Sequence, residues 1–172
     1  DREFLALKKA LGLRPQTFKS DLRLSVPQTR LMADAKHAKR VLEVGCAGGE
    51  LVLALRLAGV DATGIDESPK AIDHCQLHLD GEYRSDYAQM NYLDVGNLYK
   101  KPYDLVILCG TLDTQENPIP LVREAWEAVD VGGQLLISAG KHRFGMGDMR
   151  AIVSSLEGIV PFYVDQDDSF LY

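Results

Sequence analysis

The chain has 172 residues, of which 46% are hydrophobic, and a formal net charge of −6 at pH 7. This length can bury one sizeable core without disulfides or a metal ion. The three cysteines include no C-x-x-C pair, which argues against a disulfide framework and favours a reducing, cytoplasmic setting. No apolar run approaches the roughly 20 residues of a membrane span, and the acidity argues against a broad nucleic-acid footprint.

The N-terminal arm, residues 1–38, is basic, whereas the rest of the chain is acidic. Phe4, Leu7 and Leu11 share one helical face, and Pro27 is expected to begin a second helix. We therefore divide the chain into a helical arm, 1–38, and a main domain, 39–172. Because the sequence starts without Met and stops in a strand-like run, it is consistent with a domain of a longer polypeptide; methionine removal or a disordered tail would explain it equally well.

The most informative stretch is a glycine-rich turn, Glu-Val-Gly-Cys-Ala-Gly-Gly at 43–49, which follows an apolar run and precedes a helical pattern at 51–58. Glycines at such a junction let a ligand approach the backbone, and the helix N-terminus offers N–H donors. The pattern predicts a ligand-binding turn between a strand and a helix.

A second strand is predicted at 60–66, and it ends in Asp66 about 20 residues after the turn, where a ribose-binding carboxylate belongs. Ser68 before Pro69 predicts a helix cap and start. A dinucleotide-binding G-x-G-x-x-G fingerprint would need glycine where Ala47 and Glu50 stand, and the carboxylate of Glu50 would repel a pyrophosphate. A nicotinamide oxidoreductase is therefore disfavoured.

The remaining pattern alternates strands and helices: a strand at 103–109, an amphipathic helix at 121–129, a Gly-Gly turn at 132–133 and a strand at 134–138. This alternation is typical of an α/β fold with a mostly parallel sheet.

The acidic residue before the glycine-rich turn, the second acid at Asp66 and a third at Asp94 together resemble the class I S-adenosylmethionine-dependent methyltransferases, with Ala47 replacing a motif glycine. Over roughly residues 39 to 160 the order of elements is most similar to the ubiquinone/menaquinone-biosynthesis type. The resemblance implies a doubly wound, seven-stranded sheet with helices on both faces and S-adenosyl-L-methionine as cofactor. It also implies a set of cofactor-binding residues: Glu43, Gly45, Ala47, Gly49, Asp66, Asp94 and Cys109.

Methyl transfer needs little catalytic machinery beyond alignment of the acceptor and, for some acceptors, removal of a proton. By position, Asp113 and His142 are candidate bases, and Tyr87 and Tyr92 could supply hydroxyls or aromatic walls. No metal site is expected, because the spaced pair His74 and His78 lacks a recognisable third ligand. Residues Phe18, Leu22 and Leu24 are candidates for the acceptor pocket.

The predicted function is methyl transfer to a small-molecule, sugar or lipid-like acceptor. The basic arm has two interpretations, recognition of an anionic acceptor and a solvated face that complements the acidic body. The alternative function is a non-catalytic domain that binds S-adenosylmethionine or S-adenosylhomocysteine within a larger protein or complex. The methylated atom and the oligomeric state stay open.

Overall fold

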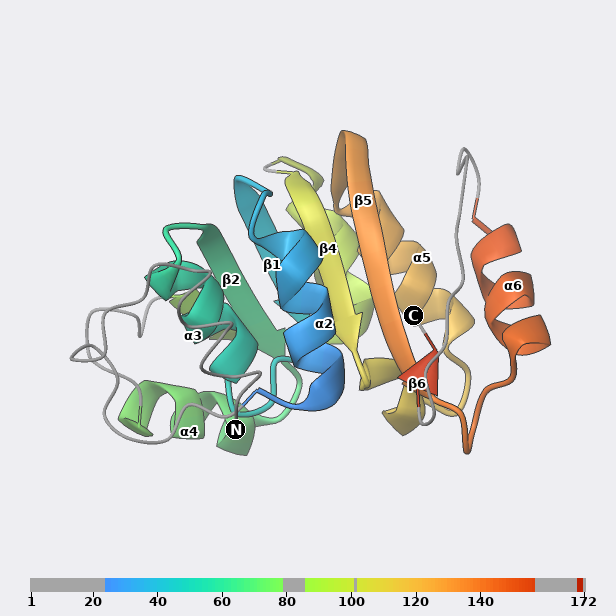
Figure 1. The fold of residues 1–172 in the computed structure, drawn as a ribbon, viewed down its shortest axis with the longest axis horizontal. Helices are drawn as coiled ribbons and strands as arrows, with labels where there is room; N and C mark the ends of the chain where they lie inside the picture. The colour runs from blue at the N-terminus through green and yellow to red at the C-terminus, as the bar shows by residue number, and fades with distance from the viewer. Residues whose placement is uncertain (1–23, 79–85, 101, 157–169, 172) are drawn as a thin grey trace.

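The computed structural model describes residues 24–78, 86–100, 102–156 and 170–171. In this part of the chain, six strands form one sheet in the order β3-β2-β1-β4-β5-β6 (Figure 1). They are β1 (Arg40–Val44), β2 (Asp61–Asp66), β3 (Tyr87–Gln89), β4 (Tyr103–Cys109), β5 (Val129–Gly140) and β6 (Phe170–Leu171).

The sheet has the doubly wound order that the sequence predicts. From β1 the chain moves outward to β2 and β3, then returns to the other side of β1 for β4 and β5. Strands β1 to β5 are parallel, and β6 runs antiparallel to β5. Seven strands were expected, and the described residues contain six of them, five parallel and one antiparallel.

Helices cover both faces of the sheet (Figure 1). They are α2 (Val26–Ala35), α3 (Glu50–Leu57), α4 (Pro69–His78), α5 (Ile119–Glu127) and α6 (Met146–Ser154), with 3₁₀ helices η3 (Tyr92–Lys100) and η4 (Thr111–Thr114). The predicted cap before Pro69 is confirmed, because Ser68 Oγ accepts a hydrogen bond from the Ala71 N–H at 3.3 Å. At α2, Ser25 and Gln28 form a reciprocal capping box.

Alternate residues of the central strands face opposite layers of the core. One cluster joins Val41, Leu105 and Ile107 to α2, α3 and α4, and the other joins Leu42, Val106 and Leu108 to η3, α5 and α6. All six of these strand side chains are 2% exposed or less. A sheet buried on both faces explains why β4 is almost continuously apolar rather than alternating.

The Gly-Gly pattern at 132–133 lies inside β5 instead of preceding it, which corrects the predicted strand boundary. Val129 already pairs with Tyr103, and the register resumes only at Leu105 opposite Gln134. The intervening residues form a bulge, and Gly132 has a φ of +78° that favours glycine.

The described part of the N-terminal arm packs into the core. Leu31, Met32 and Ala35 of α2 are buried, as predicted for a helix that begins near Pro27, and Leu24 is partly buried against the same cluster. The predicted helical face with Phe4 and the pocket candidates Phe18 and Leu22 lie outside the described residues. None of the helices in the described ranges is long and apolar enough to cross a membrane.

Candidate functional site

The carboxyl ends of four neighbouring parallel strands bring the sequence-predicted residues to one edge of the sheet, the lower edge in Figure 1. The glycine-rich turn follows β1, Asp66 ends β2, Asp94 follows β3 in η3, and Cys109 ends β4. Ligands of open α/β sheets bind outside the carboxyl ends of the strands, at the point where the strand order reverses. That point here lies between β1 and β4.

The turn after β1 requires its glycines. Gly45 has a φ of +80°, and a Cβ there would lie 2.5 Å from Thr111 Oγ1. Gly49, the N-cap of α3, also has a φ of +80°, and a Cβ there would lie 2.7 Å from the Tyr87 ring. No side chain caps α3, so the N-terminus of this helix points its backbone donors at the edge of the sheet.

Ala47, which replaces a glycine of the family motif, is the one non-glycine residue of the described chain with a positive φ, at +46°. Two contacts hold it in this conformation. Its N–H donates to Asp66 Oδ2 at 3.0 Å, and its carbonyl accepts from the Cys75 thiol at 3.3 Å. The methyl group is therefore accommodated at some cost in strain.

Asp66 combines two tasks. Its side chain is buried, with 8% exposed. Oδ2 anchors the turn by accepting from the Ala47 N–H, and Oδ1 accepts a hydrogen bond from the Ser68 N–H at 2.9 Å. Each carboxylate oxygen has a second lone pair, so the side chain can still accept from ligand hydroxyls. The anchoring task was not predicted from the sequence, because it depends on a contact between residues 19 positions apart.

Glu43 is a buried carboxylate with an unsatisfied oxygen. The residue is 1% exposed, and within the described residues nothing donates a hydrogen bond to Oε2. Burial, followed by repulsion from Glu50, raises the pKa of Glu43 well above its ordinary value, and only the Val52 amide acts against this. A buried unpaired carboxylate at a ligand-binding edge fits a cationic group of a ligand.

Asp94 lies in the first turn of η3 and is exposed. Cys109 is half-buried, its Sγ 4.0 Å from Ser138 Oγ, and burial raises the pKa of the thiol to about 12. The structure thus brings all the predicted cofactor residues to the same edge, in the order in which their strands are arranged.

Of the two tyrosines, Tyr87 has a structural contact that its sequence position does not indicate. Tyr87 is 3% exposed, and its hydroxyl donates to the Gly49 carbonyl at 2.9 Å, so it supports the turn. Tyr92 is also buried, and its backbone N–H donates to Glu67 at 3.0 Å. Sequence reasoning also missed Thr111, whose hydroxyl donates to the Val44 carbonyl at 2.7 Å and fills the space that Gly45 leaves open.

The candidate bases lie at the neighbouring strand ends. The carboxylate of Asp113 in η4 accepts a hydrogen bond from the Gly140 N–H, 3.0 Å from each oxygen. His142 follows β5 in an exposed turn. By contrast, a hollow of about 240 Å³, lined by Asp34, His37 and Asp104 among others, lies at the opposite, amino edge of the sheet.

Comparisons with known proteins identify the family. The model of a methyltransferase domain family matches residues 20–151. The chain is 36% identical over 103 residues to the ubiquinone biosynthesis O-methyltransferase of Pseudomonas savastanoi pv. phaseolicola, and 32% identical over 108 residues to that of Bordetella avium. These matches cover 58% and 62% of this chain but only 44% and 45% of the relatives, so the chain spans less than half of their length.

Solved structures agree on the fold. A SAM-dependent methyltransferase from Archaeoglobus fulgidus superposes with a TM-score of 0.61 at 16% identity, covering 91% of this chain and 74% of that one. One from Geobacter sulfurreducens, in complex with S-adenosyl-L-homocysteine, gives a TM-score of 0.54 at 17% identity, covering 81% and 55%. The chain belongs to the methyltransferase domain family that matches it.

Proposed function

We propose that this protein is a cytoplasmic enzyme that uses S-adenosyl-L-methionine to methylate a small-molecule acceptor. The observation that carries the proposal is the buried, unpaired Glu43 oxygen beside the glycine-rich turn. A carboxylate in this position suits the ammonium group at the methionine end of the cofactor, because it would gain the partner that it otherwise lacks. The unpaired thiols of Cys46, Cys75 and Cys109 support a reducing compartment.

The other edge residues fit the rest of the cofactor. Asp66, with lone pairs left after its two backbone contacts, would accept from the ribose hydroxyls. Asp94 would accept from the adenine amino group, and Gly45 and Gly49 leave the space for close approach. When bound, the cofactor supplies a methyl group on a sulfonium, which is already a strong donor.

The acceptor is proposed to be a small molecule, sugar or lipid-like compound methylated at oxygen. The O-methyltransferase names of the relatives support oxygen as the acceptor atom. We further propose that the basic arm, 1–38, contributes to the acceptor side of the site and favours an anionic acceptor.

A nicotinamide cofactor fits this turn poorly. A Cβ on Gly48 would lie 2.4 Å from a Glu50 carboxylate oxygen. The negatively charged side chain of Glu50 therefore lies directly beside the backbone of the turn. That charge would repel a pyrophosphate in the same place.

The proposal is tested by calorimetry with S-adenosylhomocysteine on wild type, Asp66→Asn and the matched control Asp73→Asn, whose side chain is exposed on α4. Asparagine retains an acceptor for the Ala47 N–H but lacks the charge that favours two ribose hydroxyls. We expect D66N to lose about 1.5 to 3 kcal/mol, or roughly 10 to 150-fold in affinity, and D73N to match wild type.

A folded wild type that binds neither S-adenosylmethionine nor S-adenosylhomocysteine would contradict the proposal. The alternative is a non-catalytic domain that binds S-adenosylmethionine or S-adenosylhomocysteine within a larger protein or complex. It predicts binding of S-adenosylhomocysteine without any methyl transfer from S-adenosylmethionine in a cell extract, whereas the enzyme would produce a mass increase of one methyl group.

A further inference from the structure

Asp113 and His142 meet around a single glycine, Gly140, the last residue of β5. A Cβ on Gly140 would lie 2.4 Å from Cε1 and 2.5 Å from Nδ1 of His142, and 3.2 Å from Asp113 Oδ2. The imidazole therefore packs directly over the glycine, and the Asp113 carboxylate lies against the same glycine without a hydrogen bond to the ring. Only a residue without a side chain allows this approach.

Hydrogen bonds from Gly140 and Arg143 fix Asp113 in place. Both of its carboxylate oxygens lie 3.0 Å from the Gly140 nitrogen, and its carbonyl accepts from Arg143 Nη1 at 2.7 Å. Arg143 also donates to the Gln115 carbonyl, so one guanidinium holds two carbonyls of the η4 region. A carboxylate held in this way is suited to orient a neighbour, whereas His142 is exposed and can reach a ligand.

This pair is adjacent to the glycine-rich turn. Thr111 of η4, two residues before Asp113, donates to the Val44 carbonyl and occupies the space next to Gly45. The Gly110 N–H donates to the Ser138 carbonyl at 2.9 Å, which joins the ends of β4 and β5. The pair thus lies on the side of the turn away from Asp66 and Asp94, next to the end of β1 where Glu43 lies.

We propose that His142 is the catalytic base that removes the acceptor's hydroxyl proton, and that Asp113 is the residue that positions it. This inference rests on the proposed methyl transfer. As the acceptor O–H bond breaks, its proton passes to Nε2 of the imidazole and the oxygen forms the new bond to the methyl carbon. The C–S bond breaks, and its electron pair stays on sulfur as a neutral thioether. For this step Asp113 has to accept from Nδ1–H, a hydrogen bond that the two residues do not make in this structure, and Nε2 is then free to take the proton.

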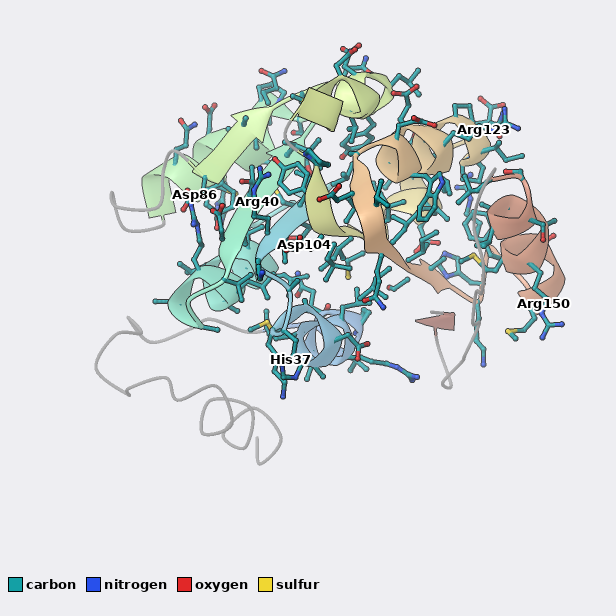
Figure 2. The ribbon with its side chains drawn as sticks, turned by 90° about the horizontal axis from the view of Figure 1, so that it is seen from above. His37, Arg40, Asp86, Asp104, Arg123 and Arg150 are labelled. Atoms are coloured by element: carbon teal, nitrogen blue, oxygen red, sulfur yellow. The ribbon has the colours of Figure 1, made fainter. Side chains whose placement is uncertain are left out.

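The first test compares His142→Gln and Asp113→Asn with the matched control His37→Gln, since His37 is exposed at the opposite edge of the sheet (Figure 2). The acceptor probe is 3,4-dihydroxybenzoate, which combines weakly acidic hydroxyls with an anionic group. We expect H142Q to lower kcat by about 10² to 10⁴-fold with a much smaller change in KM, D113N to lower kcat by a smaller factor, and H37Q to change neither.

The pH profile separates catalysis from support of the fold. The wild-type rate should fall as the pH is lowered, because a protonated imidazole cannot take a proton, and H142Q should lose this dependence. The charged groups near His142 are Asp113 of η4, which lies against the same glycine, and its sequence neighbours Lys141 and Arg143, of which Arg143 donates to the carbonyls of Asp113 and Gln115. All variants should keep wild-type affinity for S-adenosylhomocysteine, since none of the substituted residues belongs to the proposed cofactor site.

Equal rates and pH profiles for H142Q and wild type, with cofactor binding intact, would overturn the proposed roles of His142 and Asp113. The proposed methyl transfer itself would not be affected. Failure of the folded wild type to bind cofactor would overturn the proposed function instead. If the probe is not methylated, the tautomer of His142 in ¹⁵N NMR decides: we expect Nδ1–H in wild type and a shift toward Nε2–H in D113N. A wild-type Nε2–H tautomer would overturn the positioning role.

Discussion

The two edges of the same parallel sheet differ in whether the protein satisfies all of their buried charged groups. At the amino edge, Arg56 of α3 forms ion pairs with Asp86 before β3 and Asp61 at the start of β2, and Arg40 lies 3.6 Å from Asp61. Figure 2 labels Arg40, Asp86 and Asp104 on this edge. Asp104 accepts from two successive backbone N–H groups at the start of β1, each at 2.8 Å. The protein itself supplies the partners of these carboxylates.

At the carboxyl edge Asp66 and Asp113 also have backbone partners, but one buried carboxylate is left unsatisfied and one residue carries strain. Glu43 is buried with one oxygen unsatisfied, and Ala47 has a positive φ. Such features persist where the surrounding structure enforces them, and they concentrate at binding sites. We infer that the amino edge contributes stability and that the carboxyl edge gives up stability for ligand binding.

The largest expected effect is that of Glu43→Gln, with the exposed Glu127→Gln as control. The variant should lose about 1.5 to 3 kcal/mol of binding to S-adenosylhomocysteine, because the ligand ammonium no longer faces a carboxylate. Wild type should release a proton on binding, since a cationic group favours the ionised form of a carboxyl whose pKa burial has raised. Calorimetry in buffers of different ionisation enthalpy measures that release, and its absence would contradict the ligand role of Glu43.

The same variant should be more stable than wild type without ligand at neutral pH, and the pH dependence has a definite sign. The raised pKa of Glu43 lets the folded protein keep a proton that the unfolded chain releases above the ordinary value of 4.5. Wild-type stability should therefore fall, relative to E43Q, as the pH rises through this range, and the two proteins should converge in acid. Urea unfolding at several pH values tests this, and a gap that narrows with rising pH would contradict it.

Arg56→Met should lower the stability of the fold and leave ligand affinity nearly unchanged. Asp86 is 8% exposed and would lose its charged partner, so we expect a loss of about 2 kcal/mol in the free energy of unfolding. Affinity for S-adenosylhomocysteine should hardly change, because the ion pairs lie at the other edge. Arg150→Met, an exposed position on α6, is the control. A large loss of affinity in folded R56M would show that the two edges are not independent.

The smallest expected effect is that of Ala47→Gly. Glycine removes a left-handed strain of about 1 kcal/mol but gives the unfolded chain more conformational freedom, so the net gain in stability should stay below about 1 kcal/mol. Ala33→Gly, at an exposed position of α2, should instead destabilise by about 1 kcal/mol. Chemical denaturation distinguishes the two, and equal destabilisation would mean that Ala47 carries no strain.

Much of this architecture could be predicted from the sequence because it depends on local patterns. The strand that ends at Asp66, the cap at Ser68 and the helix near Pro27 each follow from a few neighbouring residues, and the structure confirms them. The resemblance likewise predicted which acids would lie along one edge, although their contacts with a cofactor stay a prediction.

What the sequence could not predict depends on distant contacts. Nothing local to Tyr87 indicates that its hydroxyl holds Gly49, 38 positions away, and Thr111 reaches Val44 across 67 positions. The two candidate bases could not be recognised as one unit, because only the packing over Gly140 brings His142 to Asp113. The strand β5 begins early because Val129 pairs with Tyr103, whereas its glycine pair alone indicates a turn.

The hydrogen bond from Tyr87 to Gly49 also couples the kinetics of two parts of the fold. β3 has only three residues at the end of the sheet, a position where strands fray readily, yet its tyrosine holds the N-cap of α3. Opening of β3 would therefore release the first turn of α3 at the same time. Amide hydrogen exchange in these two segments should follow a shared opening rate, so β3 would control how often the glycine-rich turn loosens.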